Sequence, residues 1–274
     1  MKVRLDSLLL AAVLYVFLAA CGSTTTSPST TTPTAAPVTL NLFAAASLTE
    51  SFNEIATNYQ VAHPGVKIKY NFNGSQILVQ QIINGAPADI FASADQANMK
   101  KASDAGMVGS SQIFAKNRLV VIVPVDNPGK IMTLKDLARE SVKIDSAAPA
   151  VPAGKYSLQV LDNMGQSPTY GPAYVSAVKA NFVSQEENVK AVVQKVQLGE
   201  VDAGLVYLTD VTTQVASKLK MLDIPDNFNV IAQYPIAIVK NSTHATEAQA
   251  FVRYLLATQG QAVLQKYHFV SVNG

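Results

Sequence analysis

Two serines stand at points where an apolar strand is expected to pass directly into a helix. Ser47 follows LFAAA, in which nothing is charged before Glu50, and Ser75 follows Asn73-Gly74. Either hydroxyl can cap its helix, and the segment SLTE fits the S-x-x-E capping box. Either can instead bind a ligand, because ligands of open α/β sheets lie beyond the carboxyl ends of the strands. The sequence leaves both interpretations open.

Two further helix starts are expected in the second half of the chain. In VPAG, residues 151–154, Pro152 fits the first helical position, which leaves the amides that follow it without a partner. Asn188 is a possible cap that would leave the amide of Val189 free, although Ser184 with Glu187 offers an alternative cap one turn earlier. Both helix starts therefore offer main-chain donors.

Tyr207 ends the apolar run AGLVY, where its hydroxyl can reach a cleft; a half-buried core tyrosine is the alternative. The turns described so far contain amides and hydroxyls but no Lys or Arg. Free amides and the positive end of the helix dipole bind anions. Phosphate near pH 7 keeps a proton, which a site of donors alone would leave unpaired at a cost of roughly 1–3 kcal/mol. The pattern therefore favours sulfate, molybdate or tungstate over phosphate.

The elements around these turns predict an α/β protein with two lobes. The region 38–105 has β-α-β-α-β periodicity, which predicts a mainly parallel sheet with helices on both faces. Two long apolar segments, near 118–125 and 230–240, are interpreted as crossings between lobes. We expect lobe 1 to comprise 38–118 and 237–274, lobe 2 to comprise 119–236, and the ligand cleft to lie between them.

The expected strands and helices follow from apolar spacing and from Gly and Pro positions. The strands are expected at 38–44, 66–72, 88–92, 118–125, 142–145, 181–183, 203–207, 221–224 and 230–240. The helices are expected at 48–62, 75–84, 95–105, 133–139, 151–163, 172–180, 188–198, 246–257 and 260–266.

The N-terminal segment has the pattern of a secretory signal. Lys2 and Arg4 precede an apolar run at residues 8–20, which is shorter than the roughly 20 residues that span a bilayer. LAAC resembles the bacterial lipobox, which predicts a signal peptide at 1–20 and lipidation of Cys21; a buried cysteine in an uncleaved anchor is the alternative. Residues 21–37 are rich in Ser, Thr and Pro and are expected to form a tether.

The composition excludes several classes of function. The formal net charge is +2, and no basic stripe predicts a nucleic-acid partner. Cys21 is the only cysteine, which excludes an intrachain disulfide and a cysteine-based metal site. No G-x-S-x-G, H-E-x-x-H or P-loop motif occurs, and the three histidines lack ligand spacing. We therefore expect a binding protein without catalytic residues, not an enzyme.

Several sequence blocks resemble the bacterial periplasmic molybdate-binding proteins of ABC transporters, over essentially all of 38–274. The blocks are AAASL at 44–48, FNGS at 72–75, PADIFASAD at 87–95, VPAGKY at 151–156, GLVY at 204–207 and YPIAIV at 234–239. The resemblance implies a two-lobed type II periplasmic-binding-protein fold that closes on molybdate or tungstate. It also implies five ligand residues: the hydroxyls of Ser47, Ser75 and Tyr207 and the backbone amides of Ala153 and Val189. The match at Val189 is the loosest.

The resemblance further implies a receptor that delivers molybdate to an ABC permease. We expect it to be a monomer, lipid-anchored at Cys21 on the outer face of the cytoplasmic membrane or in the periplasm, with no cofactor and no nucleic-acid partner. Any metal would contact the five ligand residues only through the oxygens of molybdate. A receptor for sulfate or another small oxyanion is the alternative, and the order of preference between molybdate and tungstate stays open.

Overall fold

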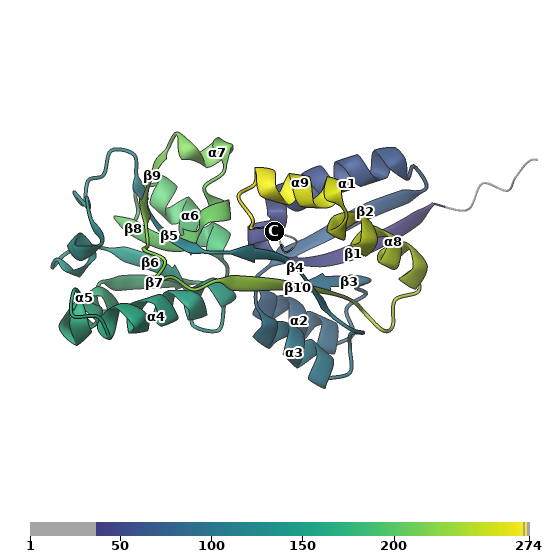
Figure 1. Ribbon diagram of the computed structural model, residues 1–274, viewed down its shortest axis with the longest axis horizontal. Coiled ribbons are helices and arrows are strands. Elements are labelled where there is room, and N and C mark those ends of the chain that lie inside the picture. Colours follow the sequence, from purple (N-terminus) through teal and green to yellow (C-terminus); the bar gives the residue numbers. More distant parts are fainter. Residues whose placement is uncertain (1–36, 271, 273–274) are drawn as a thin grey trace, which may run out of the picture. The chain divides into compact units, whose positions relative to one another are not determined.

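The computed structural model describes residues 37–270 and 272, which contain two separate five-stranded sheets with helices on their faces (Figure 1). Both sheets belong to one compact unit. The expected signal peptide, Cys21 and all of the tether except residue 37 lie outside the described residues. The two-lobed α/β fold is confirmed by the separation of the two sheets.

The first sheet has the strand order β2-β1-β3-β10-β4. Strand β1 is parallel to both β2 and β3, whereas β10 is antiparallel to its neighbours β3 and β4. The bounds are β1 (Val38–Ala45), β2 (Val66–Asn73), β3 (Ile90–Ala92), β4 (Gln112–Asn117) and β10 (Ala232–Ile238).

The second sheet has the order β7-β6-β8-β5-β9 and the same arrangement of directions. Strand β6 is parallel to β7 and β8, whereas β5 is antiparallel to β8 and β9. The bounds are β5 (Leu119–Pro124), β6 (Ile144–Ala147), β7 (Phe182–Glu186), β8 (Ala203–Tyr207) and β9 (Leu219–Asp223).

The one reversed strand of each sheet, β10 or β5, is the strand by which the chain enters that sheet. Strand β5 follows β4 after Arg118 alone, and its first residue, Leu119, pairs with Tyr207 at the end of β8. The first residue of β10, Ala232, pairs in the same way with Asn117 at the end of β4. The carboxyl ends of the parallel strands of both sheets therefore face the crossings.

The second crossing lies earlier in the chain than the sequence predicts. Strand β10 pairs with β3 and β4 along its whole length, so residues 232–236, which we expected in lobe 2, belong to the first sheet. The apolar run at 230–240 hides this boundary, because a strand buried on both faces is apolar in whichever sheet it lies.

Helices cover both faces of each sheet (Figure 1). In the first lobe, α1, α8 and α9 lie on one face and α2 and α3 on the other; in the second lobe, α4 and α5 lie opposite α6. The bounds are α1 (Thr49–Ala62), α2 (Ser75–Ile83), α3 (Gln96–Asp104), α4 (Pro152–Gly165), α5 (Gly171–Ala180), α6 (Val189–Gln197), α7 (Thr213–Ala216), α8 (Ala245–Leu256) and α9 (Thr258–Lys266). Short 3₁₀ helices lie at η1 (Ala46–Leu48), η2 (Leu134–Ala138) and η3 (Leu208–Asp210).

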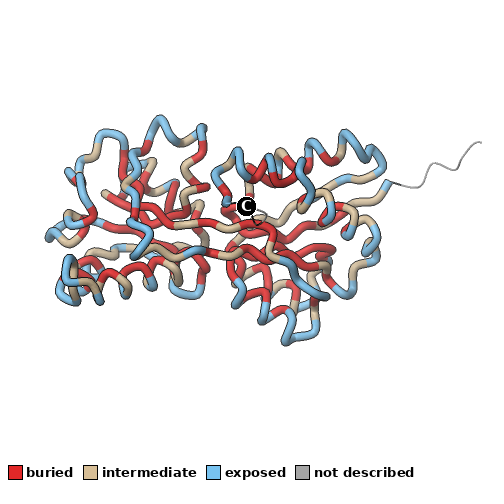
Figure 2. Tube along the Cα trace, in the orientation of Figure 1, coloured by how far each residue is buried: buried red, intermediate tan, exposed pale blue. Residues whose placement is uncertain are grey.

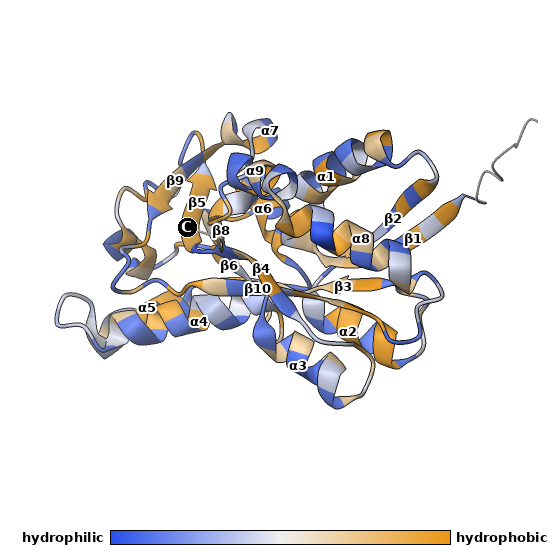
Figure 3. Ribbon diagram, turned by 45° about the vertical axis from the view of Figure 1, so that its right-hand side comes forward, coloured by the Kyte–Doolittle hydropathy of each residue, from blue (hydrophilic) through white to orange (hydrophobic). Residues whose placement is uncertain are grey.

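Burial follows this layering (Figure 2). Strands β5 (LVVIVP) and β8 (AGLVY) are buried at every position, since helices cover both faces of their sheet. Helix α6 buries Val189, Val192, Val193 and Val196, the i, i+3, i+4, i+7 spacing of an amphipathic helix. Figure 3 shows the same alternation of hydrophobic and hydrophilic residues along the outer helices. The packing holds the helix starts at the carboxyl ends of the strands.

Candidate functional site

One cavity lies where the carboxyl ends of strands from both sheets meet the starts of helices. Its lining includes Ser47 after β1, Ser75 at the start of α2, Ala153 in the first turn of α4, Val189 at the start of α6, and Tyr207 at the end of β8. The structure thus brings together all five residues that the sequence and the resemblance single out. The rest of the lining comes from the same turns and from Ala94, and contains no charged residue.

The cavity is small and its predicted ligand residues are shielded from water. The cavity has a volume of about 10 Å³, of the order needed for one water molecule. Each of the five residues has a relative exposure of at most 3%. A cavity of this size has no room for a sugar or a peptide.

The two serines do not cap their helices. The first turns of η1, α1 and α2 have no side-chain cap, so the capping interpretation of Ser47 and Ser75 is wrong. The hydroxyl of Ser47 lies 2.9 Å from that of Tyr234, and Ser75 Oγ accepts a hydrogen bond of 3.0 Å from the amide of Ala94. Because Ser75 Oγ acts as an acceptor there, its own proton remains available for a ligand.

The helix starts of the second lobe carry free amides. Helix α4 begins with Pro152 and has no side-chain cap, and the side chain of Asn188 caps α6 by accepting from the amide of Ala191 at 3.2 Å. The predicted cap at Asn188 is therefore confirmed over the alternative at Ser184. Within the described residues, no protein oxygen accepts from the amides of Ala153 or Val189. Both amides belong to the first helical turn, where the chain itself supplies no acceptor.

Gly154 fixes the position of the first turn of α4. A Cβ at this residue would lie 2.1 Å from the carbonyl oxygen of Ala147 and 2.2 Å from that of Ala148. Only glycine therefore allows the helix start to pack this closely against the end of β6, which places the Ala153 amide at the cavity.

Tyr207 has a buried hydroxyl with no hydrogen-bond partner in the described part of the chain. Burial raises the pKa of this hydroxyl well above its usual value, so it stays protonated and can donate. An unpaired buried hydroxyl costs roughly 1–3 kcal/mol. A ligand oxygen in the cavity would remove that cost, and the interpretation of Tyr207 as a plain core residue explains the hydroxyl less well.

A hydrogen-bonded network of side chains next to the cavity includes residues from both crossings. The sequence did not predict this network. The side-chain amide of Asn117 donates to the Tyr234 hydroxyl at 3.2 Å and to Thr209 Oγ1 at 2.8 Å. Tyr234 in turn contacts Ser47. Tyr234 stands in the YPIAIV block, but only the tertiary structure shows that its hydroxyl lies against Ser47, which is 187 residues away in the chain.

No metal ligands accompany the cavity. Between residues 37 and 270, and at 272, no group of three or more His, Cys, Asp or Glu side chains is placed to hold a metal ion. The nearby cations are paired with carboxylates: Lys155 Nζ lies 4.0 Å from Asp95 Oδ2, and Lys190 Nζ lies 2.7 Å from Glu50 Oε2. The dipoles of amides and hydroxyls are therefore what the cavity offers to an anion.

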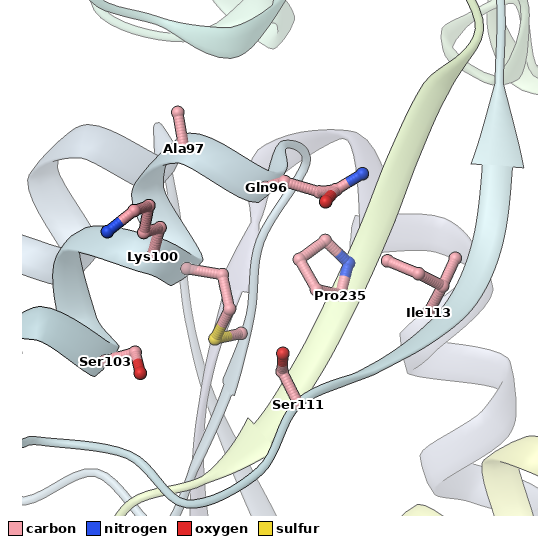
Figure 4. Close-up of a pocket in the computed structure, with 8 residues that line it drawn as sticks. Gln96, Ala97, Lys100, Ser103, Ser111, Ile113 and Pro235 are labelled. Atoms are coloured by element: carbon pink, nitrogen blue, oxygen red, sulfur yellow. The ribbon is translucent and has the colours of Figure 1, made fainter.

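A larger hollow of about 420 Å³ lies on the first lobe, between α3, the segment before β4, and β10 (Figure 4). Met99, Ile113 and Pro235 contribute apolar surface, and the cation of its lining, Lys100, is paired with Asp104 at 2.8 Å. None of the predicted ligand residues lines it. It is an open surface groove without the converging donors of the small cavity.

Residues 40–270 match a family described as bacterial extracellular solute-binding protein. The chain belongs to this family. Proteins of this family bind solutes and are not enzymes, so this solute-binding protein is a receptor. No helix in the described residues combines the length and apolar character needed to span a membrane.

Individual relatives agree with the family assignment. This solute-binding protein is 34% identical to the molybdate-binding protein ModA of Mycobacterium bovis over 97% of its own length and 98% of that protein. It is 32% identical to the solved substrate-binding domain of a putative molybdenum ABC transporter from Clostridium difficile, with a TM-score of 0.64 over 86% of this chain and 99% of that one.

A third relative supports the fold alone. The periplasmic molybdate-binding protein of Azotobacter vinelandii is 22% identical, with a TM-score of 0.72 over 84% of this chain and 98% of that one. The two-lobed architecture is thus shared with solved periplasmic binding proteins.

Proposed function

We propose that this solute-binding protein is the molybdate receptor of an ABC importer and that tungstate binds the same site. The observation that carries this proposal is a cavity lined by neutral residues, in which the hydroxyl of Tyr207 and the amides of Ala153 and Val189 have no acceptor among the described residues. The names of the relatives with more than 30% identity support the choice of ion.

In this proposal each donor has a defined role toward a tetrahedral dianion. Ser47, Ser75 and Tyr207 donate through their hydroxyls, and Ala153 and Val189 donate through their amides at the positive ends of α4 and α6. Fully ionised molybdate needs no acceptor from the protein. Hydrogen phosphate would bring a proton to a cavity whose lining contains no carboxylate, so it should bind much more weakly.

The donors come from both lobes, so the ion would stabilise the conformation in which the lobes are closed. The closed conformation is the form that we expect the permease to recognise. We further propose that the receptor acts as a monomer, needs no cofactor, and is held by lipid at Cys21 outside the cytoplasmic membrane. Detergent phase partitioning of wild type and Cys21→Ser from a bacterial host tests the anchor: only the wild type should enter the detergent phase.

Titration calorimetry with molybdate, tungstate, sulfate and phosphate tests the proposed ligand. Molybdate should bind and phosphate should not at comparable concentrations. Tight binding of sulfate with weak binding of molybdate would replace the proposal by a sulfate receptor. Absence of heat with all four ions would overturn the proposed function.

The roles of Ser47 and Ser75 are tested against a control serine, Ser51, on α1. Ser47→Ala and Ser75→Ala should each weaken molybdate binding about 10- to 100-fold, the value of one hydrogen bond to a charged group. Ser51 is also buried, but its hydroxyl donates to the carbonyl oxygen of Leu48 and is not part of the cavity lining. Ser51→Ala should therefore keep wild-type affinity; equal losses in all three variants would argue against direct ligand contacts.

A further inference from the structure

Lys190 stands at the start of α6, directly after Val189, and its ammonium group lies between carboxylates of both lobes. Lys190 Nζ is 2.7 Å from Glu50 Oε2 on α1 of the first lobe and 3.2 Å from Asp210 Oδ1 on η3 of the second lobe. The Lys190 and Glu50 side chains are 26% and 22% exposed, and that of Asp210 is fully buried. Lys190, Glu50 and Asp210 are called the Lys190 cluster below.

Each member of the Lys190 cluster is tied to a different turn of the cavity. Lys190 is the neighbour of Val189, and Glu50 lies in the first turn of α1, three residues after Ser47. Asp210 Oδ2 accepts a hydrogen bond of 3.1 Å from the amide of Tyr207. None of the three lines the cavity. The cluster therefore lies beside the ligand positions without reaching them.

The two ion pairs of the Lys190 cluster differ in whether they depend on closure of the lobes. The Lys190–Asp210 pair lies within the second lobe and does not depend on closure. The Lys190–Glu50 pair joins the two lobes, so it forms only when α1 and the start of α6 are adjacent. Burial alone would lower the pKa of Lys190, but the charges of Asp210 and Glu50 outweigh it and raise that pKa. The lysine is therefore charged at neutral pH.

We propose that Lys190 is a positioning residue that holds the lobes closed through Glu50 and so slows release of the bound oxyanion without contacting it. This rests on the proposed function. Burial raises the pKa of Asp210, and the ammonium group of Lys190 opposes this rise, so Lys190 supplies the positive charge that both Asp210 and Glu50 face.

The test measures oxyanion dissociation by stopped-flow in Glu50→Gln, following tyrosine fluorescence, since the chain has ten tyrosines and no tryptophan. Glu50→Gln keeps the Lys190–Asp210 pair and removes only the pair between the lobes. Molybdate should leave about 3- to 10-fold faster, as expected for a partly buried ion pair, while the association rate changes less than twofold. The melting temperature of the ligand-free protein should not change. If Glu50 had only a structural role, Glu50→Gln would lower that temperature.

Glu54→Gln is the matched control. Glu54 lies one turn further along α1 and pairs with Lys266 at 2.7 Å, but α1 and α9 both cover the first sheet. This variant should release molybdate at the wild-type rate. Lys190→Arg keeps the charge and should also release it slowly, whereas Lys190→Met should accelerate release more than Glu50→Gln because Asp210 loses its counter-charge.

Two results would overturn the proposal: an unchanged dissociation rate in Glu50→Gln, or equal acceleration in Glu50→Gln and Glu54→Gln. Both results concern the dissociation rates of variants, whereas a failure of the proposed function would appear as absent or altered oxyanion binding by the wild type. If the wild type binds sulfate instead of molybdate, the same comparison is made with sulfate, since closure does not depend on which dianion is held. If it binds none of the four oxyanions, both proposals are wrong.

Discussion

The hydroxyl of Tyr207 is the polar group of the cavity that most clearly lacks a partner. It is buried at the end of β8, and its ring lies 5.8 Å from that of Tyr234, centroid to centroid. The ring can pack in the core whether or not a ligand is present. The hydroxyl, in contrast, makes no hydrogen bond within the described residues, and a ligand oxygen could accept one from it.

Tyr207→Phe should therefore have opposite effects on binding and on stability. Molybdate affinity should fall about 3- to 30-fold, because one hydrogen bond is lost while the ring remains. The ligand-free protein should be as stable as the wild type or slightly more stable, since an unpaired buried hydroxyl has been removed. Calorimetric titration and thermal unfolding measure the two effects; a loss of stability in the ligand-free protein would mean that the hydroxyl has a protein partner.

Asp145 on β6 presents a second unpaired group at the residue scale. It is fully buried, and neither carboxyl oxygen has a hydrogen-bond partner in the described residues. Burial, helped by the negative charge of Glu186, raises the pKa of Asp145 to about 6. In the unfolded chain the pKa of this carboxyl should be about 3.9. Between these two pKa values, Asp145 is mostly protonated in the folded protein and mostly ionised in the unfolded chain.

This difference predicts the sign of a pH dependence. The stabilising contribution of protonated Asp145 is complete below about pH 4 and is lost as the pH rises through about 6. Asp145→Asn should be more stable than the wild type at pH 8 by about 1–3 kcal/mol, and similar at pH 4. Urea unfolding between pH 4 and pH 8 measures this. Asp104→Asn, at an exposed carboxylate, is the control and should not share the effect.

At the scale of elements, the start of α2 is shaped by contact with the other lobe. The φ of Gly74 is −59°, which any residue adopts, so glycine is not required there by the backbone conformation. A Cβ at Gly74 would instead lie 2.5 Å from the carbonyl oxygen of Glu187, which precedes α6. The same carbonyl accepts a hydrogen bond of 2.9 Å from Gln76 Nε2. Close approach of the two helix starts is what requires glycine.

Gly74→Ala should consequently weaken binding more than folding. The added methyl group meets the second lobe only when the helix starts are adjacent, and overpacking of this kind costs about 1–3 kcal/mol. Molybdate affinity should fall roughly 5- to 150-fold, while the ligand-free protein melts at nearly the wild-type temperature. Gly65→Ala, where a Cβ would contact nothing within 4 Å, is the control. Equal affinity for Gly74→Ala and the wild type would contradict this view of the closed form.

At the scale of the whole molecule, ligand binding and lobe closure are one equilibrium. Donors from α2 and from the turn after β1 face donors from α4, α6 and β8, so neither lobe holds the complete site. Two of the contacts that join the lobes near the cavity, Gln76–Glu187 and Lys190–Glu50, are polar and partly exposed. Such contacts are weak alone, which leaves the ligand to decide the equilibrium.

Molybdate should therefore raise the thermal stability of the whole unit. At about 100 times its dissociation constant it should add roughly 2.7 kcal/mol. For a domain of this size that corresponds to about 5–10 °C in melting temperature. Thermal unfolding with molybdate, and with phosphate at equal ionic strength as the control, measures the shift. An identical shift with both ions would indicate a general salt effect.

Much of the secondary structure was predictable, and its errors have local causes. The strand at Val38–Ala45 and the helices at Ser75–Ile83 and Pro152–Gly165 lie close to their expected bounds, since apolar spacing and Gly or Pro mark them. Strand β4 was missed because QIFAKN has only a short apolar run, and the expected helix at 133–139 is the 3₁₀ helix η2. Neither segment has enough apolar residues at a regular spacing to indicate its secondary structure.

The sequence by itself determined which turns carry donors and which five residues, none of them Lys or Arg, are candidates for the ligand. Only the tertiary structure decided what those groups contact: the Ser47 hydroxyl binds Tyr234 instead of capping its helix, and Lys190 pairs with Glu50, 140 residues away. The physical reason is range. Periodicity and capping act within a turn or two of the chain, whereas the partner of a buried hydroxyl or charge depends on which distant elements the two sheets bring together.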